Sequence, residues 1–301
     1  MDIENLRIFV RVAELGSFTR AAAQLGMPKS RASLRVRGLE DELDSHLFQR
    51  TTRAVRLTPD GEQLLVRARR LVDDADELTA MFSQPSTLRG RVRLELPIKL
   101  ARDIVIPRLP ELLAAHPQLE LLLGTSDRRV DVVREGFDCV LRVGALADSG
   151  LVARRLGVLP MANYVSPAYV RRYGVPATLD DLDRHFVVHY SSSLGADAPS
   201  FEYPDGNGFS ERPMRALVTV NNSEAYEAAC LAGLGIMQAP RWHREESVQH
   251  GALAEVLPEH TAAPMPVSLV HAHGRSVPKR VRAVMAWLAK TVEPCLERDG
   301  R

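Results

Sequence analysis

The sequence predicts an all-α winged helix-turn-helix module at the N-terminus, a long linker helix and a two-lobed α/β domain. Three observations carry this prediction. Residues 17–43 read as two helices around a tight turn at Gly26, residues 59–82 carry a heptad pattern, and strands alternate with helices from Arg91 onward. The predicted boundaries are 1–58 for the first module, with its helix-turn-helix at 18–37, 59–88 for the linker and 90–301 for the α/β domain.

The charge of the whole chain is nearly balanced. Its 39 Lys and Arg residues face 38 Asp and Glu residues, which leaves a formal net charge of +1. A nucleic-acid-binding surface would therefore have to be a local basic patch that is offset elsewhere. At 301 residues the chain is long enough for two or more domains with their own apolar cores.

Cysteine usage and the N-terminal segment indicate a cytoplasmic protein. Cys139, Cys230 and Cys295 are scattered singly, so neither a zinc ligand pair nor a disulfide framework is expected, and each suits a small apolar filler. The first fifteen residues begin with acids and are amphipathic, unlike a signal peptide. No apolar run approaches the roughly 20 residues that a membrane span needs, so no membrane partner is expected.

The first helix, residues 3–15, places apolar side chains on one face and ends at Gly16. Ser17 is suited to cap the second helix. Small alanines in that helix allow close packing, and Gly26 supplies a left-handed turn. The side chains expected in the core are Leu6, Phe9, Val10, Ala13, Ala21, Ala22 and Leu25.

The third helix, residues 28–43, carries two different stripes. Its apolar face, at helical spacing, consists of Ala32, Val36, Leu39 and Leu43. Its second stripe, of short polar side chains, one leucine and a guanidinium, consists of Ser30, Ser33, Leu34 and Arg37, with further cations at Lys29, Arg31 and Arg35. This stripe suits a helix in the DNA major groove. By itself it fits a solvated cationic face equally well, and the flanking chain decides between the two.

A wing is expected after the third helix. Residues 47–48 and 55–57 read as two short strands around a turn at 51–53. Arg50, Arg53 and Arg56 recur every three residues, and arginine at a wing tip suits DNA phosphates or a minor groove. The alternative, an ordinary solvated hairpin, is less compatible with the helix pair beside it.

Thr58 and Pro59 start a long helix, with a hydroxyl cap followed by proline in the first turn. The apolar positions that follow alternate spacings of four and three, as in a coiled coil. They favour a dimer that brings two DNA-reading modules together, and the alternative is one amphipathic helix lying on its own domain. The positions of this seam are Leu64, Ala68, Leu71, Ala75, Leu78 and Phe82.

Alternating strands and helices after residue 90 predict an α/β domain with a mainly parallel sheet. The first lobe is expected at 90–165 and 265–301, with a helix at 127–135. The second lobe is expected at 166–264, with an irregular loop at 191–210. Two lobes that the chain crosses twice enclose a cleft, and such clefts bind small molecules near strand ends and helix N-termini.

Two other classes of protein fit the sequence less well. A solute-binding protein would share the two lobes, but it would need a signal peptide and would lack the first 90 residues. An enzyme would need a nucleophile with its base or a metal cluster, and the sequence contains no GxSxG, HExxH, phosphate-binding loop or GxGxxG after a strand. No enzyme activity, cofactor or metal is therefore expected.

Several longer segments together carry a family resemblance. The head contains LRIFVRVAELGSFTRAAAQLG, RGLEDEL and HLFQRTTRAVRLTPDG, and the second part contains LPELLAAHPQLELLL, VSPAYVRRYG and VNNSEAYEAACLAGLGI. Over nearly its whole length the chain thus resembles the LysR-type transcriptional regulators. The resemblance implies a winged helix-turn-helix domain, a dimerising linker helix and a periplasmic-binding-protein-like effector domain. It also implies a homotetramer that binds double-stranded promoter DNA and a small-molecule co-inducer, with RNA polymerase as a further candidate partner.

By this resemblance, the residues at or near DNA lie in the second and third helices and in the wing. The family often has Ser where Pro28 stands, so a capping hydroxyl is replaced by a rigid helix start. It often has Arg where Leu34 stands, and an apolar side chain there suits a thymine methyl rather than guanine, which predicts an altered operator preference. The residues carried over are Thr19, Arg20, Pro28, Lys29, Ser30, Arg31, Ser33, Leu34, Arg37, Arg50 and Arg53.

The same resemblance places the effector site in the cleft, beginning at Ile98, Lys99 and Leu100. Where the family commonly has Ser or Thr, Lys99 suits a small organic or aromatic carboxylate; the alternative is a lysine whose stem covers apolar surface. His189 is interpreted first as a structural histidine, and Asn222 has helix capping as an alternative to ligand binding. The further cleft residues carried over are Thr125, Val143, Asn163, His189, Asn221, Asn222 and Gln238.

Overall fold

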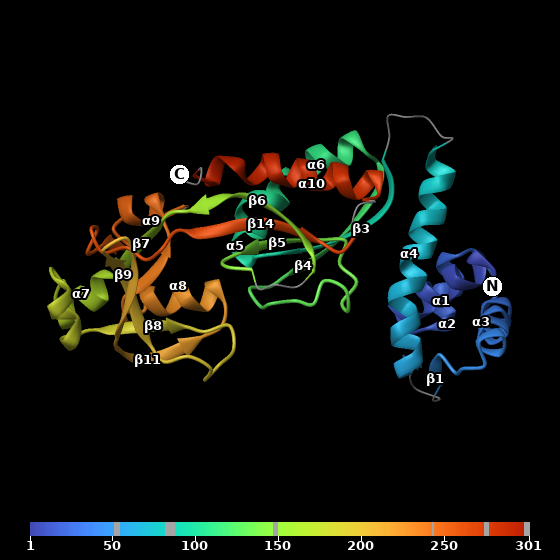
Figure 1. The fold of residues 1–301 in the computed structure, drawn as a ribbon, viewed down its shortest axis with the longest axis horizontal. Coiled ribbons are helices and arrows are strands. Elements are labelled where there is room, and N and C mark those ends of the chain that lie inside the picture. The colour runs from blue at the N-terminus through green and yellow to red at the C-terminus, as the bar shows by residue number, and fades with distance from the viewer. Residues whose placement is uncertain (51–54, 82–87, 147–149, 243, 274–276, 298–301) are drawn as a thin grey trace.

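The structure is a computed structural model that describes residues 1–50, 55–81, 88–146, 150–242, 244–273 and 277–297. Figure 1 shows an elongated molecule with the N-terminal helices at one end and a two-lobed α/β part at the other. The long helix α4 (Pro59–Met81) stands between them, beside the first lobe. The predicted fold class, a winged helix-turn-helix module followed by two α/β lobes, is therefore confirmed.

Three helices and a two-stranded wing form the N-terminal module. The turn between the second and third helices contains Gly26 at φ 64°, the left-handed conformation that glycine adopts readily. Ser17 caps the second helix by accepting a hydrogen bond from the backbone of Arg20, as its sequence position predicts. Leu6, Phe9 and Ala21 are almost completely buried in the shared core. The elements are α1 (Ile3–Leu15), α2 (Phe18–Gln24), α3 (Lys29–Leu43), β1 (Phe48–Arg50) and β2 (Val55–Leu57).

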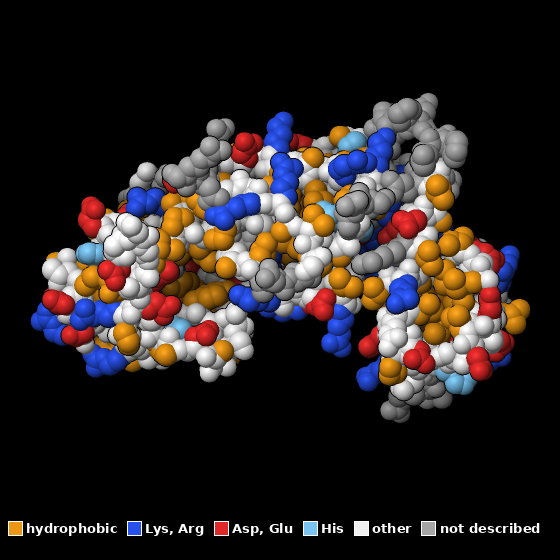
Figure 2. Space-filling view, in the orientation of Figure 1, with side chains coloured by type: hydrophobic (Ala, Val, Ile, Leu, Met, Phe, Trp, Pro, Cys, Tyr) orange, Lys and Arg blue, Asp and Glu red, His pale blue; other side chains and the backbone are white. Residues whose placement is uncertain are grey.

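The heptad positions of α4 divide between two environments. Ala68 is fully buried in the core of the N-terminal module, and Leu64 packs against that core. Leu71 and Leu78 are 44% and 61% exposed. Figure 2 shows hydrophobic side chains gathered on the visible face of this module, over α1 and α4. Part of the predicted seam thus holds α4 on its own domain, and another part remains on the surface. The last predicted position, Phe82, lies outside the described residues.

A five-stranded sheet forms the first lobe, in the order β4-β3-β5-β14-β6. β3 runs parallel to β4 and β5, whereas β14 runs antiparallel to β5 and β6, so the sheet is mixed and not mainly parallel as expected. Val281, Val284 and Leu288 of α10 are completely buried against it. The elements are β3 (Arg89–Leu96), α5 (Ile98–Leu100), a π-helical turn at Ala101–Val105, α6 (Ile106–Ala115), β4 (Gln118–Thr125), β5 (Cys139–Val143), β6 (Val152–Leu159), β14 (Met265–His271), α10 (Lys279–Val292) and a 3-10 turn at Glu293–Cys295.

Smaller sheets form the second lobe. β8 and β11 are parallel, β7 lies between β12 and β13, and β9 and β10 form a hairpin. Tyr169 of α7 is fully buried, and its hydroxyl lies 2.9 Å from His185 Nδ1. The elements are β7 (Met161–Val165), α7 (Pro167–Tyr173), a 3-10 turn at Leu179–Arg184, β8 (Phe186–Tyr190), β9 (Ser200–Asp205), β10 (Gly208–Pro213), β11 (Arg215–Val220), α8 (Ser223–Leu231), β12 (Met237–Pro240), α9 (Glu245–Gln249) and β13 (Ala254–Glu255).

The prediction of a helix at 127–135 is wrong. This segment forms turns, because its own carboxylates bind backbone donors that a helix would otherwise satisfy. Asp131 Oδ1 accepts hydrogen bonds from the backbone of Val133 and Arg134 at 3.1 and 2.9 Å, and Glu135 Oε1 accepts from the backbone of Asp131 at 3.0 Å. Two apolar residues separated by one, Val130 and Val132, are buried, which is strand-like spacing and not helical spacing.

Two further expectations differ from the structure in the second lobe. The irregular loop expected at 191–210 contains β9 and the start of β10, and Phe201 of β9 is completely buried. Residues 161–165 were expected in the first lobe, but as β7 they pair with β12 and β13. The chain therefore enters the second sheet immediately after β6. Among the described residues, no helix has the length and apolar character that crossing a membrane requires.

Gly61 lies where α4 approaches the wing. A Cβ built on it falls 2.2 Å from the carbonyl oxygen of Leu47, which is a backbone atom with little freedom to move. We expect Gly61→Ala to destabilise the N-terminal module by about 1–3 kcal/mol through overpacking. Gly38→Ala in α3 is the matched control, because nothing lies within 4 Å of its Cβ and alanine favours the helix by about 0.5–1 kcal/mol. Calorimetry that ranks the two variants in the opposite order would contradict this contact.

Candidate functional site

One face of α3 projects away from the N-terminal core. Ala32, Val36 and Leu39 are completely buried on the opposite face, whereas Leu34 is 70% exposed. Figure 2 shows Lys and Arg side chains along the outer edge of this module, where α3 lies in Figure 1. The other exposed residues predicted to read DNA from this helix are Pro28, Lys29, Ser30, Arg31 and Arg37. The helix therefore presents donors and cations around an apolar centre, as direct readout in a major groove requires.

The remaining predicted DNA residues have different surroundings. Pro28 provides no side-chain cap for α3, and Ser33 is half-buried. Thr19 and Arg20 are exposed at the start of α2, and the Arg20 guanidinium donates a hydrogen bond to the carbonyl of Leu15. In this structure Arg20 thus closes the end of α1. A phosphate contact from its guanidinium would have to replace or share that hydrogen bond.

Arg35 lies on α3, but it is half-buried and binds the beginning of α1. Its guanidinium NH1 lies 3.1 Å from Asp2 Oδ2 and 3.2 Å from Asn5 Oδ1. These contacts tie α3 to the beginning of α1. The cationic stretch that looks continuous in the sequence is thereby divided into residues facing outward and one residue that fixes the helix.

Glu40 connects the reading helix to the wing, a role that sequence reasoning missed. Its carboxylate is buried and accepts hydrogen bonds from the backbone of Leu47 at 2.9 Å and of Phe48 at 3.2 Å. The sequence could have indicated this role, because Glu40 lies four residues after Val36 and therefore on the buried side of the helix. β1 and β2 pair antiparallel as predicted. The side chain of Arg50 and the whole of Arg53 lie outside the described residues.

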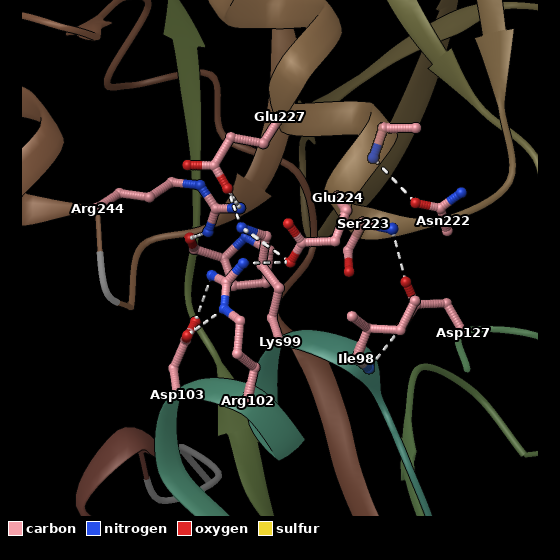
Figure 3. A network of polar contacts seen from close by, with 12 residues as sticks. Ile98, Lys99, Arg102, Asp103, Asp127, Asn222, Ser223, Glu224, Glu227 and Arg244 are labelled. Carbon is pink, nitrogen blue, oxygen red and sulfur yellow. Dashed lines mark hydrogen bonds and ion pairs between the residues drawn. The ribbon is translucent and has the colours of Figure 1, made fainter. Parts of the chain in front are cut away.

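A network of charged and polar groups joins the two lobes where α5 faces the start of α8 (Figure 3). Lys99, from the first lobe, forms an ion pair with Glu227, and its Nζ lies 3.7 Å from Glu224 Oε1. Arg244 is buried, and its NH2 lies 3.9 Å from the same Glu227 Oε2. Lys99 therefore does not project into solvent as the snorkelling alternative requires; its side chain is 16% exposed and reaches across to the second lobe.

Arg102 extends the network on its solvent side. Its NH1 donates to Glu224 Oε1 at 2.7 Å, and its Nε and NH2 bind Asp103. The hydrogen bond to Asp103 is the largest cause that raises the pKa of Arg102 above its ordinary value, and the negative charge of Glu224 adds to it. Three cations of the network thus contact acids of this same chain.

Asp127 bridges the lobes through backbone groups. Its Oδ1 accepts a hydrogen bond from the backbone of Ile98 at 3.1 Å, and its Oδ2 accepts from the backbone of Ser223 at 2.6 Å. Ser223 is the first residue of α8, so this carboxylate occupies an anion-binding helix start. Burial raises the pKa of the neighbouring Tyr190 hydroxyl to about 12, and the Asp127 charge contributes to the increase.

Asn163 and Gln238 pair with each other inside the second lobe. Asn163 is completely buried, and its Nδ2 donates to the carbonyls of Leu257 and His260, each at 3.0 Å. Gln238 Nε2 donates to Asn163 Oδ1 at 2.9 Å and to the carbonyl of Glu202 at 2.8 Å. His189 is buried, with its Nε2 3.2 Å from the carbonyl of Asp197, which agrees with the structural interpretation. These amides and this imidazole hold the lobe together.

The network around Lys99, Asp127 and the start of α8 is called the lobe seam from here on. The other predicted effector residues lie near the lobe seam or belong to the core. Asn222 caps α8 by accepting a hydrogen bond from the backbone of Ala225 at 2.9 Å, and Asn221 beside it is exposed. Thr125 is exposed at the end of β4, whereas Leu100 is buried and Val143 packs against the first-lobe core. The structure thus brings Ile98 and Lys99 close to the start of α8.

Sequence reasoning missed six residues of this network, namely Arg102, Asp103, Asp127, Glu224, Glu227 and Arg244. Glu224 and Glu227 lie three positions apart at the start of a helix, and Asp127 follows closely after a strand, so local patterns were present. Arg244 carried no such pattern. Among the described residues, no three His, Cys, Asp or Glu side chains are grouped to hold a metal ion.

A winged helix-turn-helix head, joined by one long helix to a two-lobed α/β domain, defines a DNA-binding regulator with a separate regulatory domain. The chain belongs to the LysR family: the family described as "Bacterial regulatory helix-turn-helix protein, lysR family" matches residues 3–62, and "LysR substrate binding domain" matches residues 85–293. Its relatives are transcriptional regulators and not enzymes.

Known relatives cover almost the whole chain. The uncharacterized HTH-type transcriptional regulator YhjC of Escherichia coli K12 is 42% identical over 296 residues, or 98% of this chain and 99% of that protein. An HTH-type transcriptional repressor of Pseudomonas aeruginosa is 34% identical, over 93% of this chain and 89% of its own length. The structure of CrgA, a LysR-type regulator from Neisseria meningitidis, covers 96% of this chain and 98% of its own, with 27% identity and a TM-score of 0.60.

Proposed function

We propose that this regulator reads promoter DNA with the exposed face of α3 and that the wing arginines Arg50 and Arg53 contact the phosphates beside it. The exposed face of α3 carries this proposal, because it combines Lys29, Arg31 and Arg37 with a fully buried opposite face. Cations position the helix through phosphates, while Ser30 and Leu34 are placed to contact base edges. Since promoter DNA is the partner, the protein acts in the cytoplasm.

A gel-shift titration with promoter fragments tests this function. Specific binding should weaken steeply with salt, by a slope of about 0.9 for each phosphate contact neutralised. Arg37→Gln should weaken binding, whereas Arg184→Gln, a change in the second lobe at a side chain that is 80% exposed, should leave it unchanged. Equal affinities for the two variants and the wild type would contradict the proposed reading face.

Leu34→Arg is expected to change which operator is preferred. The leucine side chain is 70% exposed at the centre of the reading face, where it suits a thymine methyl, and arginine would instead donate to guanine. One such exchange is worth about 1–3 kcal/mol of discrimination at a single base pair. Binding-site selection should show one position moving from T·A toward G·C. An unchanged selected sequence would contradict the assignment of Leu34 to base readout.

The proposed assembly is a homodimer through α4 that pairs further into a homotetramer. The exposed Leu71 and Leu78 provide an apolar face for the first contact. A dimer presents two α3 helices to successive half-sites, which increases affinity without enlarging either head. Sedimentation at increasing protein concentration tests the assembly, and a monomer at micromolar concentration would contradict it. RNA polymerase is the proposed partner at the promoter.

The proposed effector is a small organic or aromatic carboxylate that binds at the lobe seam beside Lys99. Glu227 already places a carboxylate there, in contact with Lys99 and 3.9 Å from Arg244. Arg244 Nε is buried and has no hydrogen-bond partner among the residues that the structure describes, so it offers a further donor. Two cations around one internal carboxylate favour an external carboxylate that displaces Glu227 or shares its partners. Asn221 and Asn222, which are also proposed to contact the effector, directly precede α8, the helix that carries Glu227.

Glu227→Gln is expected to increase carboxylate affinity by about tenfold, because it removes an internal competitor worth about one charge-assisted hydrogen bond. Thermal-shift titrations with benzoate and succinate would measure this change through ligand-linked stabilisation. Lys99→Gln should lose the response, and Glu259→Gln, at an exposed position of the same lobe, should behave as the wild type. Equal responses in wild type and Lys99→Gln would place any carboxylate site elsewhere.

The effector would act by changing how the two lobes meet and thereby the relative orientation of the paired DNA-binding heads. The seam supports this mechanism, because Lys99, Asp127 and Arg102 of the first lobe all contact the start of α8 in the second. Footprint length and DNA bending should differ between the free and the effector-saturated protein. Identical footprints and bend angles at saturation would contradict the mechanism.

A further inference from the structure

A cluster of arginines lies between the N-terminal module and the first lobe, far along the chain from the lobe seam. Glu14 at the end of α1 is 11% exposed and forms ion pairs with four of them. Arg91 NH1 lies 2.5 Å from Glu14 Oε2, and Arg11 NH1 lies 3.4 Å from the same oxygen. Arg69 Nε and Arg93 NH1 lie 3.5 and 3.7 Å from Glu14 Oε1. One carboxylate is therefore shared by guanidinium groups from α1, α4 and β3.

A cavity of about 230 Å³ adjoins this cluster and is lined by all five residues. Among the described residues, the buried Nε of Arg93 has no hydrogen-bond partner, and the buried Nε of Arg69 makes no hydrogen bond beyond its 3.5 Å ion pair with Glu14. A buried donor without an acceptor is costly, and the cost is greater for a charged group. The cavity is also much larger than the space that one water molecule needs. These features leave room and unused donors for an additional acceptor.

The acids that line the same cavity are already engaged by other groups. Asp76 binds Arg7 through two hydrogen bonds, at 2.7 and 3.0 Å. Asp73 lies 2.9 Å from Arg280, and burial raises the pKa of its carboxyl to about 7, which reduces its negative charge at neutral pH.

Two further acids complete the surroundings of the cluster. Asp138 accepts a hydrogen bond from the backbone of Arg93 at 2.8 Å and faces His273 Nε2 at 3.4 Å. Glu120 binds Arg91 at 3.1 Å but is 61% exposed. Among the described residues, the four guanidinium groups around Glu14 form ion pairs with this carboxylate and with Glu120, and Asp73 adds a weaker electrostatic contribution at Arg69. Four cations thus share two paired carboxylates, and positive charge is in excess. Burial lowers the pKa of Arg69, and the positive charge of Arg93 lowers it further.

We propose that this cavity binds a small oxyanion through Arg69 and Arg93. The planar forks of two guanidinium groups match the oxygens of a phosphate or a carboxylate. Because Arg69 belongs to α4 and Arg93 to β3, the anion would link the DNA-binding module directly to the regulatory lobe. This site is separate from Lys99 and does not depend on the effector assignment.

Calorimetric titration of the full chain with inorganic phosphate, at pH 7.5 and constant ionic strength, tests the proposal. The wild type should show one saturable site per chain. Arg69→Gln and Arg93→Gln should each weaken binding by at least about tenfold, the equivalent of one charge-assisted hydrogen bond. Glu14→Gln should strengthen binding severalfold, because it removes the carboxylate that competes for the same donors. Pyrophosphate and acetate titrations then distinguish phosphate from carboxylate ligands.

Two control variants separate this cavity from other cationic surfaces. Arg37→Gln, on the face of α3, should retain phosphate binding, and so should Arg184→Gln in the second lobe. The opposite signs expected for Glu14→Gln and Arg93→Gln distinguish an anion site from a merely structural ion cluster, in which both changes would only loosen the interface. No saturable binding, equal binding by all variants, or loss confined to Arg37→Gln would overturn the proposal.

Discussion

Replacing Glu40 by alanine is expected to reduce DNA affinity on the order of a hundredfold while leaving the regulatory lobes folded. The buried carboxylate accepts hydrogen bonds from the backbone of Leu47, which directly precedes the wing, and of Phe48, the first residue of β1. Its loss leaves two buried donors without their acceptor, at a cost of about 1–3 kcal/mol each. A cost of about 2.7 kcal/mol corresponds to a hundredfold change in affinity. Gel shifts with a selected operator, at neutral pH and a fixed salt concentration, would measure this loss of affinity.

Asp41→Ala is the matched control for this effect, because Asp41 is the next residue of the same helix and is exposed. Glu40→Gln provides an intermediate case, since its amide oxygen can accept hydrogen bonds from the same donors without the charge. The affinity for the operator is expected to be highest for Asp41→Ala, lower for Glu40→Gln and lowest for Glu40→Ala. If Glu40→Ala bound operator as tightly as Asp41→Ala, the wing would not depend on this carboxylate.

Replacing Asn163 by alanine is expected to destabilise the second lobe by about 3 kcal/mol, the upper end of the usual range, because it breaks a buried hydrogen-bond network. The side chain is completely buried and makes three hydrogen bonds, two to the carbonyls of Leu257 and His260 and one from Gln238. Alanine leaves these partners unsatisfied and opens a small cavity. Thermal unfolding followed by circular dichroism and tryptophan fluorescence would report the loss.

The control for Asn163→Ala is Asn221→Ala, because Asn221 is exposed beside the seam and should leave stability within about 0.5 kcal/mol of the wild type. The two variants also separate structural from ligand-binding roles. A stable Asn163→Ala protein that had lost only its effector response would contradict the structural role. It would instead indicate that Asn163 binds the effector.

The N-terminal module was predictable because its determinants are local. The apolar spacing of α3, the cap at Ser17 and the turn at Gly26 each depend on residues a few positions apart. All three are present in the structure, except that Leu43, the last residue of the predicted apolar face, is 38% exposed. The prediction of a helix at 127–135 was wrong for an equally local reason, which the spacing of apolar residues does not reveal. Its aspartate and glutamate side chains bind the backbone of the same segment and compete with helix formation.

The charged network at the lobe seam was only partly predictable. The position of Lys99 followed from the family resemblance, but its partner Glu227 lies 128 residues later in the chain. A contact of that separation depends on how the two lobes fold against each other, which no short pattern encodes. The same holds for Asn163 and Gln238, which the family resemblance placed in the cleft and whose pairing inside the lobe required the structure.

Asp127 has a consequence for how sharply each subunit responds. Its carboxylate is held by one backbone donor from each lobe, Ile98 and Ser223, so separating the lobes leaves at least one of these hydrogen bonds unmade. A partly opened seam would lose that bond without gaining a replacement, and intermediate openings are therefore disfavoured. Each subunit is expected to switch between two discrete arrangements. A graded transcriptional response would then reflect the fraction of subunits that have switched, and its steepness would be set by how many subunits must switch together.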